Sequence, residues 1–143
     1  MLKRFACLAV VFCLPHLAYG QEDLKKLQGT WVLDGLEVNG ARVAIDRLDG
    51  TTTVIKDDLY TVTIKNDTKF VMQIRLDEKK DPRELDMIAQ DGANKDKVHK
   101  AIYQIKDGLF TVVRGLNPDQ ARPRDFATSA NTGYFMATWK KKE

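Results

Sequence analysis

The chain has very little cysteine. Cys7 and Cys13 both lie in an N-terminal segment that we expect to be removed, so the remaining chain has none. This excludes disulfides, a thiol nucleophile and a cysteine metal site from the mature domain. A domain of about 120 residues without covalent links must be stabilised by its own hydrophobic core, and that length is sufficient.

Serine and histidine are almost as scarce. From residue 21 onward Ser129 is the only serine and His99 the only histidine, and we expect both on the surface. A hydrolytic triad requires a nucleophile, a base and an orienting group together. One histidine cannot form a usual zinc site, and Asp91, Asn94 and Asp96 lack the ligand spacing of an EF-hand loop. The sequence therefore predicts no enzyme, no cofactor and no metal.

An excess of one charge is also missing. The whole chain has 23 basic and 20 acidic residues, and removal of Lys3 and Arg4 with the N-terminal segment leaves 21 basic residues. A domain so close to neutrality has no electrostatic basis for binding nucleic acid or an anionic membrane. We therefore expect neither partner.

The longest hydrophobic run, from 5 to 17, is too short to span a bilayer. It follows two cations and precedes Ala18-Tyr19-Gly20, a pattern typical of a secretory signal peptide. We expect residues 1–20 to be this peptide, with cleavage near Gly20, and residues 21–143 to form one domain. The product is predicted to be secreted or periplasmic, with no membrane insertion after cleavage.

The rest of the chain is a succession of short segments in which apolar and polar residues alternate. Turn residues such as Asn39-Gly40 and Asp107-Gly108 separate them, and a change of phase at Asp34-Gly35 predicts a bulge. The predicted strands cover 29–38, 51–56, 60–65, 69–76, 84–87, 98–105, 110–112 and 134–139. They predict an all-β, antiparallel, up-and-down eight-stranded barrel, with a two-sheet β-sandwich as the alternative. For 21–26 one helical turn and a frayed terminus are equally compatible.

Gly29 and Trp31 open the first strand. Residues two apart share a face of a strand, and glycine permits a sharp turn or a close approach. We therefore expect the large Trp31 ring to seal one end of the barrel.

Three segments together carry a family resemblance. They are 23–31, with Leu27-Gln28-Gly29-Thr30-Trp31 at its end, 102–105, Ile-Tyr-Gln-Ile, and Arg122-Pro123 followed by Phe126. The chain resembles, from about residue 23 to 140, a family of small secreted lipocalin-like domains of unknown function that is abundant in planctomycete bacteria. The resemblance implies an eight-stranded barrel and a basic side chain packed across the Trp31 ring. It assigns no ligand or reaction.

We expect the cation on Trp31 to come from Arg122, with Arg124 and Lys140 as alternatives. A different role for these arginines is an ion pair, in which Asp86 binds Arg122 or Arg124. An exposed pair of that kind would contribute little.

Large side chains alternate onto the inner faces of the predicted strands. An eight-stranded barrel either fills with side chains or holds one small ligand, and the size of these residues favours filling. Buried hydroxyls of Tyr60 and Tyr103 would need partners, which favours a polar spot inside. The expected inner residues are Tyr60, Phe70, Met72, Met87, Tyr103, Phe110 and Tyr134.

The loop from 115 to 132 is long enough to cover the open end, and the nearby Arg114, Arg122 and Arg124 can attract a carboxylate head group. The first hypothesis is a non-enzymatic exported barrel that binds a small hydrophobic or amphiphilic ligand through these inner residues and Arg122. The alternative is a protein-interaction or inhibitor domain with a filled core, acting through its loops. A hydrolase is a distant third.

Overall fold

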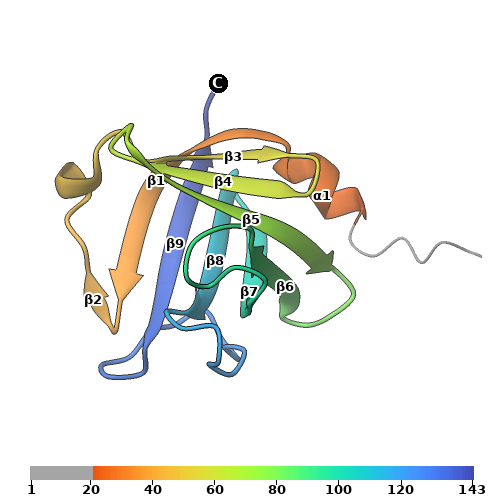
Figure 1. The fold of residues 1–143 in the computed structure, drawn as a ribbon, viewed down its shortest axis with the longest axis vertical. Coiled ribbons are helices and arrows are strands. Elements are labelled where there is room, and N and C mark those ends of the chain that lie inside the picture. The colour runs from red at the N-terminus through yellow and green to blue at the C-terminus, as the bar shows by residue number, and fades with distance from the viewer. Residues whose placement is uncertain (1–20) are drawn as a thin grey trace, which may run out of the picture.

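The structure is a computed structural model that describes residues 21–143, so the expected signal peptide lies outside the described residues. Within them, two short helices and nine strands follow one another (Figure 1). The elements are α1 (Gln21–Leu27), β1 (Gly29–Val38), β2 (Ala41–Arg42), η1 (Ile45–Leu48), β3 (Thr52–Lys56), β4 (Leu59–Ile64), β5 (Thr68–Asp77), β6 (Arg83–Ala89), β7 (Val98–Lys106), β8 (Leu109–Gly115) and β9 (Tyr134–Lys141).

Eight of the strands close into an antiparallel barrel. β1 pairs with β3, each strand from β3 to β8 pairs with the next along the chain, and β9 returns to pair with β1. The short β2 is an addition that pairs only with the end of β1. The predicted lipocalin-like, up-and-down barrel is confirmed, and the sandwich alternative is wrong because closure leaves no second layer.

A bulge in β1 changes which residues face the interior. Leu33 pairs with Trp139 on β9. The neighbouring residue of β9, Thr138, pairs with Gly35, so Asp34 has no partner and is the extra residue of the bulge. Inward positions are therefore odd-numbered up to Leu33 and even-numbered after the bulge. The phase change predicted at Asp34-Gly35 is confirmed.

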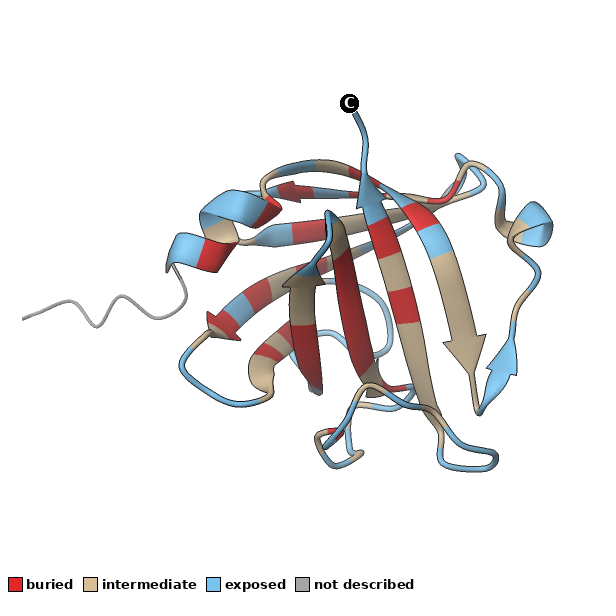
Figure 2. Ribbon diagram, turned by 180° about the vertical axis from the view of Figure 1, so that it is seen from behind, coloured by how far each residue is buried: buried red, intermediate tan, exposed pale blue. Residues whose placement is uncertain are grey.

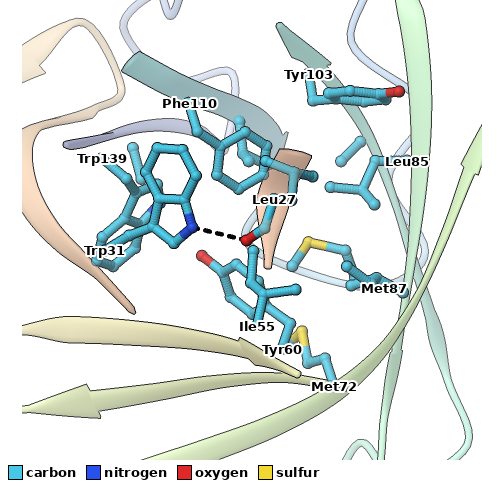
Figure 3. Close-up of a cluster of buried hydrophobic side chains, with 14 of the residues drawn as sticks. Leu27, Trp31, Ile55, Tyr60, Met72, Leu85, Met87, Tyr103, Phe110 and Trp139 are labelled. Carbon is cyan, nitrogen blue, oxygen red and sulfur yellow. Dashed lines mark hydrogen bonds between the residues drawn. The ribbon is translucent and has the colours of Figure 1, made fainter. Parts of the chain in front are cut away.

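The end of the barrel at the start of β1 is closed by α1 (Figure 1), and many residues at this end are buried (Figure 2). Trp31 is 3% exposed, its Nε1 donates to the Leu27 carbonyl at 2.8 Å (Figure 3), and its ring centroid lies 5.8 Å from that of Phe110. Gly29 has a backbone φ of +115°, a value that residues with a side chain rarely adopt. The first position of β1 therefore requires glycine.

The cation on the Trp31 ring is Lys141, whose Nζ lies 5.3 Å from the ring centroid. Our assignment of Arg122 to this position was wrong, as were the alternatives Arg124 and Lys140. The β1–β9 register places Lys141 directly opposite Trp31. That register arises when the barrel closes, which local sequence does not reveal.

Arg122 instead holds the loop 116–133 against the outside of the barrel. Its Nη2 donates to Asp86 Oδ1 at 2.6 Å, and its Nη1 donates to the Ala101 carbonyl at 2.6 Å. The suggested ion pair with Asp86 is therefore present. Ile102 and Val113 pair with each other on the outer face of the barrel, because they alternate with residues that face inward. Both are nevertheless fully buried, which fits a loop that lies over this outer face.

Candidate functional site

The barrel contains a cavity of about 300 Å³ in the half away from α1. Along β1 it extends from Leu33 to Val38, whereas α1 and Trp31 lie at the beginning of that strand. The interior is therefore filled at one end and open at the other, although the size of the side chains favoured filling throughout. The cavity is lined by Leu33, Leu36, Val38, Leu48, Thr51, Tyr60, Val62, Ile64, Phe70, Met72, Met87, Val112, Arg114, Leu116, Phe135, Ala137 and Trp139.

Strand alternation decides which residues reach the cavity. On β8 Phe110, Val112 and Arg114 face inward, so a positively charged residue follows two apolar ones into the interior. On β9 Phe135 lies directly opposite Arg114. Among the described residues that line the cavity, Arg114 is the only charged one.

The Arg114 guanidinium is held in place by neutral groups. Its Nη1 donates to His99 Nδ1 at 2.9 Å and to the Gly115 carbonyl at 2.9 Å, and its Cζ lies 4.4 Å from the Phe135 ring centroid. No carboxylate lies within 4.0 Å of it in the part of the chain that the structure describes. Burial lowers the pKa of Arg114 to about 10, so the group remains charged at neutral pH.

His99 is 3% exposed, so our expectation that it lies on the surface was wrong. His99 lies on the same face of β7 as the inward-facing Ala101 and Tyr103. Burial, and then the charge of Arg114, lower the pKa of His99. Because arginine only donates, the accepting Nδ1 carries no proton, and the neutral ring has its proton on Nε2. Ser129, by contrast, is exposed on the loop 116–133.

The inner end of the cavity contains polar side chains that lack partners. Thr51 and Trp139 are 4% and 3% exposed, and neither Thr51 Oγ1 nor Trp139 Nε1 has a hydrogen-bond partner among the described residues. The Tyr60 ring packs edge-to-face against Trp139 at 6.4 Å, and the Tyr60 hydroxyl lies near Thr53 and Trp139. Burial raises the pKa of Tyr60. Most buried polar side chains have a partner. Both of these atoms have almost no accessible surface, so they lie within the cavity wall and do not face the space inside it.

The predicted inner residues divide between the two halves. Tyr60, Phe70, Met72 and Met87 line the cavity, and Phe70, at 45% exposed, forms part of its rim. Tyr103 and Phe110 also face inward, but they belong to the filled half.

In the filled half, the Tyr103 hydroxyl donates to Asp23 Oδ2 at 2.9 Å. Burial and the adjacent carboxylate raise the pKa of Tyr103, which keeps this hydroxyl protonated as a donor. The hydrogen-bond partner of the Tyr103 hydroxyl is therefore a residue of α1, and no polar group in the cavity is required.

Tyr134 and Arg122 do not reach the cavity, so these two assignments were wrong. Tyr134 faces outward, and its hydroxyl donates to the Ala121 carbonyl at 3.1 Å. Phe135, Ala137 and Trp139 occupy the inward phase of β9 instead. Counting back in steps of two from Trp139 would have identified this phase, because tryptophan is the residue on that strand with most apolar area to bury.

Comparison with protein-family models, curated proteins and solved structures finds no match for this chain. Neither helix of residues 21–143 has the length and apolar character needed to cross a membrane. In the same residues no group of three or more histidine, cysteine, aspartate and glutamate side chains is placed to hold a metal ion.

Proposed function

We propose that this chain is a non-enzymatic, exported lipocalin-like domain that binds a small hydrophobic or amphiphilic molecule inside its barrel. The observation that carries the proposal is the cavity of about 300 Å³, lined almost entirely by apolar side chains and containing one guanidinium. Pockets for small ligands have this composition, and this volume is near the lower end of their range. The occupant is therefore a single small molecule.

The polar groups of the cavity suit binding better than catalysis. His99 Nδ1 already accepts a hydrogen bond from Arg114, so that nitrogen cannot take a proton from a substrate. The serine that a hydrolase would need, Ser129, is exposed on the loop 116–133. Arg114, Tyr60 and Trp139 can orient a ligand, but they do not form a nucleophile and base pair.

The test is to fill the cavity without disturbing the filled half. Ala137 lines the cavity and is 4% exposed, so Ala137→Phe should occupy much of the space that a ligand would take. Native mass spectrometry of the exported protein should show a bound small molecule in the wild type and none in this variant. Ala93→Phe, on an exposed loop, is the matched control and should retain the ligand.

Leu36→Trp, from a different strand, repeats the experiment if Ala137→Phe does not fold. Retention of the same molecule by folded Ala137→Phe and Leu36→Trp would place the ligand outside the barrel and contradict the proposal. Export is tested separately, by fractionation and N-terminal sequencing of the purified protein. We expect the mature chain to begin near Gln21.

A protein-interaction domain acting through its loops is the second candidate. It is favoured by Phe70 and Leu116, which line the cavity mouth and are 45% and 44% exposed. Exposed apolar side chains at a rim can contact a protein as well as a ligand. In that case Phe70→Ser would abolish capture of a defined protein partner, while Ala137→Phe would leave it intact.

A further inference from the structure

We infer that the open end of the barrel docks on the surface of a lipid bilayer, with Phe70, Val98 and Leu116 entering the apolar layer of the lipid. These three residues are called the apolar rim. The inference extends the proposed function and rests on it, because a bilayer is a source of small hydrophobic molecules for the cavity. Three observations support it: where the exposed apolar side chains lie, what they border, and which charges surround them.

The apolar rim consists of large apolar side chains that remain in contact with water. Phe70 is 45%, Leu116 44% and Val98 36% exposed. Phe70 lies near the start of β5, and Leu116 directly follows β8. Val98 begins β7 and precedes His99, which accepts the hydrogen bond from Arg114 at the cavity. The strands from β5 to β8 are four of the eight in the barrel, so the rim follows the mouth along half of its circumference.

The apolar rim is continuous with the apolar lining of the cavity, because Phe70 and Leu116 belong to both. On the other side of the mouth, Val38 and Ile64 are the last residues of β1 and β4, are half-buried and also line the cavity. The way into the barrel is therefore apolar on both sides. A hydrophobic molecule would enter most readily where the mouth is shielded from water, as it is in contact with lipid.

Lysines are in excess around two of the rim residues. Lys69 precedes Phe70 and Lys97 precedes Val98, and both lysines are exposed. A lysine has a long apolar stem and a charged end, so it can reach a lipid phosphate while its neighbour enters the acyl layer. Segments 65–70 and 90–100 together contain Lys65, Lys69, Lys95, Lys97 and Lys100 but only Asp67, Asp91 and Asp96. This excess is small, so docking depends mainly on apolar contact, and the near-neutral charge of the whole chain does not oppose it.

A bilayer fits the apolar rim better than a folded partner does. A standard protein interface buries about 800 Å² on each side around an apolar core, whereas this rim borders the opening of a cavity. Acyl chains are fluid and can adapt to such an edge. A second copy of this chain would bring the lysines of two mouths together, which like-charge repulsion disfavours.

The contact is expected to be weak and reversible. Three partly exposed side chains bury less apolar surface than one myristoyl chain, which alone gives marginal membrane binding with an association constant of about 10⁴ M⁻¹. Millimolar lipid is therefore needed to observe docking. Brief contact of this kind would let the protein exchange a ligand with the bilayer and leave again.

The experiment places a reporter tryptophan in the apolar rim of the exported protein. Phe70→Trp and Leu116→Trp are compared with Leu59→Trp, the matched control, because Leu59 is 43% exposed and follows the turn that contacts the end of α1. Each protein is mixed with phosphatidylcholine vesicles with or without bromine on the acyl chains, since bromine quenches a tryptophan that it contacts. We expect quenching of both rim reporters and none of Leu59→Trp. The wild type should also be unaffected, because Trp31 and Trp139 are buried.

Further variants separate docking from ligand binding. In the Leu116→Trp protein, Phe70→Ser should reduce the quenching, because the two side chains enter the lipid together. Leu59→Ser in the same protein is the control and should leave the quenching unchanged. Ala137→Phe, which fills the cavity, should also leave it unchanged, because docking uses the rim and not the space inside.

The possible failures are distinguishable. Absence of quenching in both rim reporters would overturn the docking, while the proposed function, tested by native mass spectrometry, would stand. Equal quenching of Leu59→Trp would overturn it as well, because lipid contact would not be confined to the open end. Quenching of the wild type would mean that the barrel opens on lipid, which contradicts docking of the folded mouth.

Two further outcomes concern the alternatives. Unquenched rim reporters together with loss of a defined protein partner in Phe70→Ser would assign the apolar rim to a protein and overturn the inference. Quenched rim reporters in an exported protein that carries no small molecule would support the docking surface and contradict the proposed function.

Discussion

The two ends of the barrel treat their buried polar groups in opposite ways. At the closed end Asp23, which is 1% exposed, accepts hydrogen bonds from Arg83 at 2.6 Å and from Tyr103 at 2.9 Å. The Trp31 indole nitrogen likewise donates to the Leu27 carbonyl. Charge meets opposite charge and donors meet acceptors, so this end has the properties of a structural core.

At the open end the same kinds of group lack complementary partners. Arg114 has no carboxylate among the described residues, and Thr51 and Trp139 each have a buried polar atom without a partner. Phe70 and Leu116 are left exposed at the rim. Such features reduce stability, so their concentration in one half is what a binding site would require.

The comparison separates the residues that stabilise the fold, in one half of the barrel, from the residues of the proposed binding site, in the other half. This separation predicts two different effects of substitution. Substitutions at the closed end should destabilise the protein, and substitutions at the open end should alter ligand preference with little effect on stability.

The largest effect is expected for Trp31→Ala. Removing this ring takes away its contact with Phe110 and its hydrogen bond to Leu27, and we expect a loss of about 3–5 kcal/mol in the free energy of unfolding. Trp31→Phe keeps a ring but not the indole donor, so its loss should be smaller. Urea denaturation measures both. A loss below about 1 kcal/mol for Trp31→Ala would show that this end does not depend on the ring.

Asp23→Ala should have the next largest effect. It leaves the buried Tyr103 hydroxyl and the Arg83 guanidinium without their shared acceptor, and we expect a loss of about 2–3 kcal/mol. Glu22→Ala on the same helix is the control, because Glu22 is exposed and its ion pair with Lys25, at 3.9 Å, is weak. Equal urea midpoints for these two variants would contradict the structural role of Asp23.

Features determined by local sequence could be predicted, and features determined by closure could not. The Asn39-Gly40 hairpin and the bulge after Leu33 follow from backbone preferences and alternation over a few residues. The seal at Trp31 followed from its large apolar area. The cation on its ring did not, because Lys141 is brought there by pairing between the first and last strands of the barrel.

The candidate site was predicted only in part for the same reason. Tyr60, Met72 and Met87 alternate cleanly in their own strands and line the cavity. Tyr134 faces outward because Trp139 sets the inward phase of β9 and lies an odd number of residues from Tyr134. Arg114 continues the inward phase of Phe110 and Val112 on β8, which local alternation specifies. The position of Arg122 outside the barrel depends on where the loop 116–133 packs, and local sequence does not specify that.

A smaller effect is expected from pH, through His99. Burial and Arg114 lower the pKa of His99 in the folded protein, whereas an unfolded histidine titrates near 6.5. Below about pH 6.5 the unfolded chain binds a proton that the folded protein does not, so stability is complete above that pH and decreases as the pH falls.

The check is the urea midpoint at pH 7.5 and at about pH 5.5, compared between the wild type and His99→Gln. Glutamine can still accept from Arg114 but does not titrate, so the variant should lose less stability on acidification. Gly115 contributes only a carbonyl to this cluster, and Arg114 remains charged throughout the range. The same decrease in both proteins would assign the pH dependence to carboxylates elsewhere.

The smallest effect on stability is expected for Arg114→Met, and it is the most informative. The variant loses a hydrogen bond to His99 and a contact with the Phe135 ring, but it also removes a buried charge that has no counter-charge. Replacing buried charged groups with apolar ones is often neutral or stabilising, so we expect the free energy of unfolding to change by no more than about 1 kcal/mol. If Arg114→Met instead destabilises the protein as much as Asp23→Ala, the guanidinium is part of the core, and the open end is no more specialised for binding than the closed one.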